Sequence, residues 1–221
     1  MQADYRRKPE WLKIKLPNGQ KSAKVVGLLN HHCLHTICTS GMCPNRGECW
    51  GNGTATFMIG GNVCTRNCRF CNVATGKPMP LDTKEIDDIV IEQKPDIISQ
   101  NLETVRRLTP EVRCKATYDC SLSVLEYIAK AGIRTKSGIM LGLGETREEI
   151  LQTMDDLLSV NCKIMTIGQY LQPTEKHYPV QDYIHPDTFA EYAVIGKEKG
   201  FRHIESAPLV RSSYHAERHI Q

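Results

Sequence analysis

The sequence lacks the features that mark several common protein classes. No apolar stretch approaches the roughly 18 residues of a membrane-spanning helix, and residues 1–16 contain no apolar run long enough for a signal peptide. The formal net charge is +3, and no block of Lys and Arg or stripe of aromatic residues favours nucleic-acid binding. We therefore expect one globular domain inside the cell, because 221 residues are enough to bury a sizeable core.

Cysteine, in contrast, is abundant, with ten in the chain. Cys64, Cys68 and Cys71 lie in the stretch CTRNCRFC, which has CX3CX2C spacing. A structural zinc site normally has four protein ligands, and no Cys or His follows within twelve residues. Structural 4Fe–4S clusters are held by four cysteines, whereas three thiolates leave one iron open to a substrate. The triplet therefore predicts a catalytic iron–sulfur cluster, with a zinc-binding interaction module as the alternative.

A second triplet lies upstream. Cys38, Cys43 and Cys49 form CX4CX5C in the stretch CTSGMCPNRGEC, again without a fourth cysteine. The Gly, Pro and Asn residues of this segment favour turns that can wrap a compact group. Alone, the spacing is a moderate signal, but next to the first triplet it predicts a second cluster. The remaining cysteines are expected to be small buried thiols: Cys33, Cys114, Cys120 and Cys162.

The CX3CX2C spacing, with an aromatic residue before its last cysteine, resembles the signature of the radical S-adenosylmethionine (SAM) superfamily. The two triplets, separated by GTATFMIGG, together resemble the lipoyl synthase family of that superfamily. The C-terminal RSSYHA at 211–216 is similar to the terminal motif of the same family. Further similar segments extend through most of the chain: RKPEWLK at 7–13, LHTIC at 34–38, NLETV at 101–105, TKSGIMLGLGET at 135–146 and TIGQYLQP at 166–173.

The resemblance implies the chemistry of that family. SAM binds the open iron of the CX3CX2C cluster, and its cleavage yields a 5′-deoxyadenosyl radical. An auxiliary 4Fe–4S cluster on the CX4CX5C triplet, with Ser213 as its fourth ligand, supplies sulfide. The implied reaction inserts two sulfurs, at C6 and C8 of a protein-bound octanoyl-lysine, to form the lipoyl cofactor. The implied catalytic residues are Cys64, Cys68, Cys71 and Ser213, and the implied metal ligands are these four with Cys38, Cys43 and Cys49.

The same resemblance implies which residues contact SAM and which partners the protein needs. The expected substrates are octanoylated lipoyl-carrier domains or proteins, and the expected electron donor is a protein such as flavodoxin or ferredoxin. We expect a monomer that binds neither nucleic acid nor membrane. The absence of a transit peptide before RRKPEW favours a cytoplasmic location. The residues expected to bind SAM are Phe70, Asn101, Glu103, Gln169 and Leu171.

The hydrophobic pattern predicts strands that alternate with helices, and hence a parallel sheet with its chemistry at the carboxyl ends of the strands. Thr146 and Glu149 predict a capping box. Asp119 predicts the cap of a helix that Gly132 ends. Strands are expected at 54–59, 97–98, 137–143 and 164–170, with helices starting at Asp82 or Thr83, at Asp119 and at Thr146, and another at 185–199 ended by Gly200.

The sequence departs from the family pattern at residues 92–94, which stand in place of a longer segment. The family has two further βα units there, of roughly 30 residues each, including the motif SVDRDD, which this chain lacks. We therefore expect an α/β fold, a partial (β/α) barrel of the radical SAM type reduced to about four parallel strands, with the first beside the former fourth. Cysteine-rich N-terminal and C-terminal extensions flank this barrel, giving segments 1–53, 54–206 and 207–221.

The missing units would leave the wall around SAM incomplete. Radical chemistry needs the exclusion of water and accurate positioning of the reacting groups. The departure therefore predicts reduced turnover. The alternative function is that of a cluster-binding but catalytically impaired deletion product or pseudoenzyme of the same family.

Overall fold

A parallel sheet forms the centre of the molecule. The computed structural model describes residues 8–13, 20–31, 35–58, 62–77, 95–113, 115–212 and 214. The sheet has the order β3-β4-β5-β6, and every neighbouring pair is parallel. The predicted α/β class with about four parallel strands is thereby confirmed. The strands are β3 (Ile97–Ser99), β4 (Arg134–Leu141), β5 (Ile164–Gln169) and β6 (His203–Ser206).

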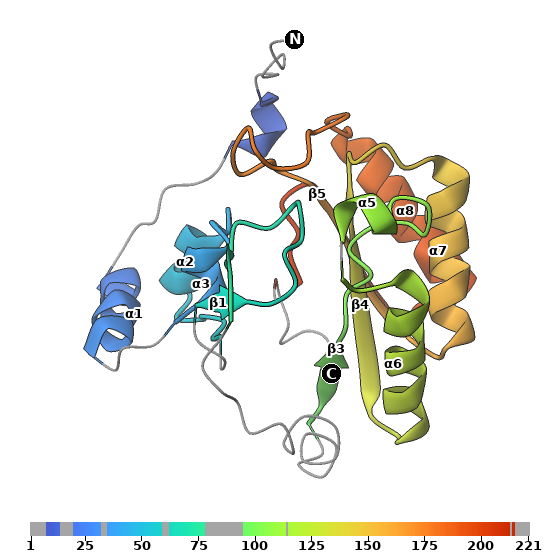
Figure 1. The fold of residues 1–221 in the computed structure, drawn as a ribbon, viewed down its shortest axis with the longest axis horizontal. Coiled ribbons are helices and arrows are strands. Elements are labelled where there is room, and N and C mark those ends of the chain that lie inside the picture. The colour runs from blue at the N-terminus through green and yellow to red at the C-terminus, as the bar shows by residue number, and fades with distance from the viewer. Residues whose placement is uncertain are drawn as a thin grey trace.

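Helices connect these strands and cover one face of the sheet (Figure 1). The helices are α5 (Thr109–Val112) and α6 (Tyr118–Lys130) between β3 and β4, α7 (Arg147–Ser159) between β4 and β5, and α8 (Pro186–Lys199) between β5 and β6. Leu125, Met154 and Phe189, one from each long helix, are completely buried with Met165 and Ile167 of β5. This core makes the sheet the rigid part of the molecule. None of the described helices is long and apolar enough to cross a membrane.

The ends of the long helices follow local sequence signals. The capping box of Thr146 and Glu149 is present at the start of α7 as predicted, and Gly200 ends α8 in the left-handed conformation at φ 111°. The predicted cap at Asp119 is wrong, because the N-cap of α6 is Thr117, two residues earlier, and the Thr117 side chain accepts from the backbone N–H of Cys120. Local rules therefore place these helices to within two residues.

The first predicted strand is wrong for the part of 54–59 that the structure describes. Residues 54–58 form no strand: Phe57 makes one antiparallel bridge with Thr36, and its side chain is 53% exposed. A strand needs a partner for its backbone groups, and the units that would have followed it are those missing from this chain. The fourth strand is instead β6, which the sequence pattern does not reveal. The helix expected from Asp82 or Thr83 lies outside the described residues.

The cysteine-rich segments lie on the side of the sheet opposite the helices (Figure 1). The N-terminal segment has the short turn η1 (Glu10–Leu12) and the helices α1 (Gln20–His31), α2 (Ile37–Ser40) and α3 (Arg46–Gly51). The CX3CX2C loop runs between two strands of two residues each, β1 (Val63–Cys64) and β2 (Ala74–Thr75), which pair in parallel. These segments have little regular structure of their own.

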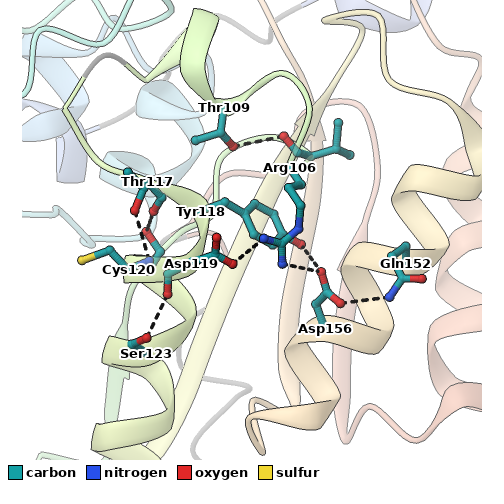
Figure 2. A network of polar contacts seen from close by, with 11 residues as sticks. Arg106, Thr109, Thr117, Tyr118, Asp119, Cys120, Ser123, Gln152 and Asp156 are labelled. Carbon is teal, nitrogen blue, oxygen red and sulfur yellow. Dashed lines mark hydrogen bonds and ion pairs between the residues drawn. The ribbon is translucent and has the colours of Figure 1, made fainter.

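A polar network fixes the loop after β3 to the helical layer (Figure 2). The guanidinium of Arg106 pairs with the carboxylates of Asp119 and Asp156, and it lies over the ring of Tyr118 at 4.4 Å. The hydroxyl of Tyr118 donates to Asp156 Oδ2 at 3.0 Å, and the amide of Gln152 donates to Asp156 Oδ1 at 2.9 Å. Asp156 is thus the acceptor shared by the loop, α6 and α7.

We expect Asp156→Ala to lower the free energy of unfolding by about 1–2 kcal/mol, because it removes one acceptor from three donors. Urea unfolding monitored by circular dichroism measures this change. Asp155→Ala is the matched control, because Asp155 makes a largely exposed ion pair with Lys199 worth about 0.5 kcal/mol or less. Equal losses in the two variants would show that the network does not stabilise the fold.

Candidate functional site

The CX3CX2C loop is held on two sides by the rest of the chain. On one side, the backbone N–H of Arg69 donates to the carbonyl of Val112 at 3.0 Å. On the other, the N–H of Tyr178 donates to the carbonyl of Arg69 at 2.9 Å, and the Arg69 guanidinium lies 5.3 Å from the Tyr178 ring centroid. His177 Nε2 is 3.1 Å from the carbonyl oxygen of Cys71. The loop therefore lies against the end of α5 and against the segment that follows β5.

The thiols of this loop lie in a half-buried, crowded environment. Burial raises the pKa of Cys68 to about 11, and the carboxyl group of Glu103 and the thiol of Cys71 add to the effect. Burial likewise raises the pKa of Cys71, with Glu103 and Cys64 contributing. Cys68 and Cys71 thus influence one another and share Glu103 as a neighbour, and Cys64 lies within reach of Cys71. Binding of a metal or cluster has to displace their protons, so it depends on pH.

The CX4CX5C triplet lies in a small apolar cluster of its own. Cys38 is buried with Leu29 and Trp50, and Cys43 and Cys49 pack against this cluster from its rim. The N–H of Cys43 donates to the carbonyl of Cys38 at 3.0 Å. Burial raises the pKa of Cys43. The three thiols of the second triplet are therefore also brought into one neighbourhood.

Neither triplet is closed into a metal-binding geometry. Across the described ranges of the chain, no three His, Cys, Asp or Glu side chains are arranged to hold a metal ion. Cys120 and Cys162 lie outside the triplets; Cys162 is buried as expected, but the expectation is wrong for Cys120, which is exposed on α6. Cys33, Cys114 and Ser213 lie outside the described residues.

A buried cation beside the first triplet fits a negatively charged cluster. Arg113 is 2% exposed, and its Nη1 donates to the carbonyl of Leu102 at 2.9 Å and to Ser121 Oγ at 3.2 Å. Its Nε and Nη2 atoms are buried without a hydrogen-bond partner. Burial lowers the pKa of Arg113, while Glu103 and Cys68 oppose that shift. Three thiolates and an iron–sulfur cluster would supply the negative charge that this site lacks, so the donor set fits such a group.

The carboxyl edge of β3 contributes the polar side chains that the sequence predicts there. Glu103 has the left-handed backbone conformation at φ 69°, which is uncommon for a residue other than Gly. Its backbone N–H donates to the carbonyl of Gly138 at 2.9 Å, and its carbonyl accepts from Met140 at 2.8 Å. The Asn101 amide donates to Glu103 Oε1 at 3.1 Å. Burial raises the pKa of Glu103. This carboxyl group therefore lies within electrostatic reach of Cys68 and Cys71, on a constrained backbone.

The other predicted SAM contacts have different surroundings. Gln169 is fully buried, and its amide donates to the carbonyls of Leu141, Tyr170 and Asp182 and accepts from the N–H of Ile184. These backbone contacts account for the whole amide group. Phe70 packs against the main core, and Leu171, just after β5, is half-buried. Contact of these three residues with SAM remains a prediction.

The C-terminal segment joins the CX4CX5C region to the sheet, which local sequence reasoning does not anticipate. On either side of Ser212, Asn45 Nδ2 donates to the carbonyl of Leu209 at 2.5 Å and the Tyr214 hydroxyl donates to Glu48 Oε1 at 3.1 Å. Figure 1 shows the red segment passing between β1 and the sheet. Ser212 itself contacts Asn101, just after β3, and Lys136 of β4. Residues 207–212 therefore form a bridge between the CX4CX5C triplet and the sheet.

Two cations, one buried and one partly buried, support this bridge. Arg211 Nη1 donates to the carbonyl of Val210 at 2.6 Å; burial lowers the pKa of this guanidinium, while Cys43 and Glu103 both oppose the shift. Arg211 thus lies within the electrostatic reach of both cysteine regions. Lys136 of β4 is 3% exposed, and its Nζ donates to the carbonyl of Ser212 at 2.5 Å. Lys136 lies in TKSGIMLGLGET and Arg211 in RSSYHA, two segments that resemble the family, but the resemblance gives no role to either residue.

A small cavity of about 50 Å³ lies under the bridge. Its lining includes Asn101, Glu103, Gly138, Arg211 and Ser212. Ligand sites for molecules of the size of SAM occupy roughly 300–1,000 Å³. Binding of such a ligand therefore requires the side chains around this cavity to rearrange.

Lys136 should make stability depend on pH. Burial lowers its pKa to about 8, so between pH 8 and its unfolded value the unfolded chain binds more protons and stability rises with pH. Lys136→Met should therefore raise the free energy of unfolding at pH 7. This increase should be about 2 kcal/mol smaller at pH 10. Chemical unfolding at several pH values measures it. Lys130→Met, at an exposed lysine, should show no such trend; a matching trend there would contradict the assignment to Lys136.

Comparison with known proteins agrees with this site. Residues 82–157 match the radical SAM superfamily. With the CX3CX2C loop placed against the carboxyl edge of a parallel sheet, the chain is an enzyme of the radical SAM class, which uses SAM and an iron–sulfur cluster.

Relatives then give the family. A lipoyl synthase from Bacteroides thetaiotaomicron is 48% identical over 281 aligned residues, covering 99% of this chain and 100% of that protein. One from Treponema denticola is 50% identical over 276 residues, covering 97% and 95%. The chain belongs to the lipoyl synthase family, as the sequence motifs predict. The first alignment is longer than the 221-residue chain by about 60 positions, the length of two βα units.

A solved structure also matches, at lower similarity. The crystal structure of Streptococcus suis SuiB bound to S-adenosylmethionine is 15% identical, with a TM-score of 0.46 over 56% of this chain and 31% of that chain. This likeness is too remote to add to the family assignment.

Proposed function

We propose that this enzyme inserts two sulfurs, at C6 and C8 of a protein-bound octanoyl-lysine, to form the lipoyl cofactor. The observation that carries the proposal is the 48% identity to a lipoyl synthase over the full length of that relative. The bridge of residues 207–212 supports it, because this segment contacts both the CX4CX5C region and the edge of the sheet near the CX3CX2C loop. A reaction that joins a radical site to a sulfur source needs these two regions side by side.

Two 4Fe–4S clusters are part of the proposal. Cys64, Cys68 and Cys71 would hold one cluster and leave an iron for SAM, and Cys38, Cys43, Cys49 and Ser213 would hold the other. When bound, these groups supply the radical and the sulfide. The chain supplies position and charge: Arg113 compensates the thiolates, and Glu103 presents a carboxylate toward the CX3CX2C loop. Phe70, Asn101, Gln169 and Leu171 complete the proposed SAM-binding set.

The proposed partners follow from this reaction. The substrates are octanoylated lipoyl-carrier domains or proteins, and the electron donor is a small redox protein such as flavodoxin or ferredoxin. We propose a monomer that acts in the cytoplasm, as the bacterial origin of the relatives supports. Segments 1–53, 54–206 and 207–221 would serve as auxiliary-cluster extension, shortened barrel and C-terminal ligand tail. Turnover would be reduced, because residues 54–58 do not join the sheet and the wall is shorter than in relatives.

Cys68→Ala should abolish SAM cleavage, because it removes one of the three ligands that leave an open iron. The measurement is 5′-deoxyadenosine formed by anaerobically reconstituted protein with dithionite and SAM. Cys120→Ala removes an exposed thiol of α6 and should match the wild type. Normal cleavage by Cys68→Ala would contradict the ligand assignment, whereas no cleavage by the wild type would identify a cluster-binding protein without catalysis.

Cys43→Ala should separate the two clusters. We expect the iron content to fall from about eight to about four per chain, while 5′-deoxyadenosine is still formed and no sulfur reaches the octanoyl peptide. Iron analysis and mass spectrometry of the peptide measure the two effects, with Cys120→Ala again as control. Lipoyl product from Cys43→Ala would refute the role proposed for the CX4CX5C triplet.

A further inference from the structure

The amide group of Asn101 is fully occupied by protein groups. Its Nδ2 donates to Glu103 Oε1 at 3.1 Å and to Ser212 Oγ at 2.6 Å, and its Oδ1 accepts from Ser99 Oγ at 3.3 Å. A side-chain amide has two N–H groups, and these contacts use both. In this arrangement Asn101 orients the carboxylate of Glu103.

Glu103 lies within electrostatic reach of the first cysteine triplet. Its carboxyl group acts on the thiols of both Cys68 and Cys71, and its backbone is fixed by hydrogen bonds to Gly138 and Met140. SAM is a sulfonium that also carries an ammonium group, so a buried carboxylate at this position suits its positive charge. The direction in which this carboxylate points then depends on Asn101.

Ser212 is fixed from the opposite side. Lys136 Nζ holds its carbonyl at 2.5 Å, and the chain on either side is anchored by Asn45 to Leu209 and by Tyr214 to Glu48. The hydroxyl of Ser212 is thereby presented to Asn101 by a segment that also contacts the CX4CX5C region through Leu209 and Tyr214 and pairs with β5 through Ala207 and Pro208. The family motif assigns a ligand role to the second serine of RSSYHA, and none to this first one.

We propose that Ser212 is a positioning residue for SAM binding, acting through Asn101 on the carboxylate of Glu103. This inference rests on the proposed function, because it concerns the SAM site of the same enzyme. It links that site to the docking of the C-terminal segment. SAM therefore binds tightly when the segment is seated against the CX4CX5C region and weakly when it is displaced.

The test is the SAM affinity of reconstituted protein, measured from the change that SAM causes in the EPR spectrum of the reduced cluster. Ser212→Ala should raise the Kd about three- to tenfold, as expected for one lost hydrogen bond. Ser212→Thr, which keeps the hydroxyl, should restore most of the affinity. Ser123→Ala, on the outer side of α6, is the matched control and should leave the Kd unchanged.

A double-mutant cycle distinguishes the relay from independent effects. If Ser212 acts through Asn101, then Asn101→Ala with Ser212→Ala should bind SAM no more weakly than Asn101→Ala alone. If the two substitutions instead multiply each other's effects on the Kd for SAM, the proposal is overturned. An unchanged Kd in Ser212→Ala would also overturn it, as would tighter binding, which would mean that Ser212 occludes the site.

A second readout needs no cluster. In the cluster-free protein, Ser212→Ala should speed amide hydrogen exchange of Val210 and Tyr214, whose N–H groups donate to the carbonyls of Ala207 and Arg211 within the segment. Unchanged exchange would show that the Asn101 contact does not seat the segment. A wild type that binds and cleaves SAM, with an unaffected Ser212→Ala, would leave the proposed function standing and refute this inference alone.

Discussion

Metal ligands on loops keep their geometry only where contacts outside the loop hold them, and this constraint shapes the whole molecule. The cysteines lie in segments with very short helices and strands, which could not fix their positions alone. The buried core of β4, β5 and three helices provides the rigid reference. Val112 and Tyr178 anchor the CX3CX2C loop to this core, and the segment 207–212 anchors the CX4CX5C loop to it. The cysteine-rich side is thus organised by contacts that reach it from the sheet.

Two guanidinium groups near the cysteines also link the cysteine-rich side to the fold. Arg113 is buried and Arg211 is partly buried near thiols, and in both cases burial opposes the charge that nearby Cys and Glu groups favour. A buried cation without a full complement of partners is costly. The chain without clusters therefore carries a strain that thiolate-bound clusters would relieve, so loading with clusters should also stabilise the fold. Folding and cofactor assembly are coupled through these two guanidinium groups.

The sequence predicts those parts of the fold that depend on neighbours along the chain. The capping box of Thr146 and the left-handed Gly200 are local devices, and the cysteine spacings are ligand sets within single loops. The predictions that fail concern contacts between residues far apart in the sequence. Residues 54–59 have strand propensity, but propensity does not supply a partner strand, and β6, with His203 and Glu205 among its four residues, shows no apolar run. The contact of Asn101 with Ser212 joins positions 111 residues apart, for which one sequence holds no signal.

The short first strand of the sheet has a consequence for the behaviour of the protein in concentrated solution. Within the part of the chain that the structure describes, β3 pairs with β4 alone and has no strand partner on its other side. Open edges can recruit strands from other molecules and start aggregation. With three residues, β3 offers too short a template for such growth. A very short edge strand is one of the features by which natural proteins avoid strand pairing between their own copies.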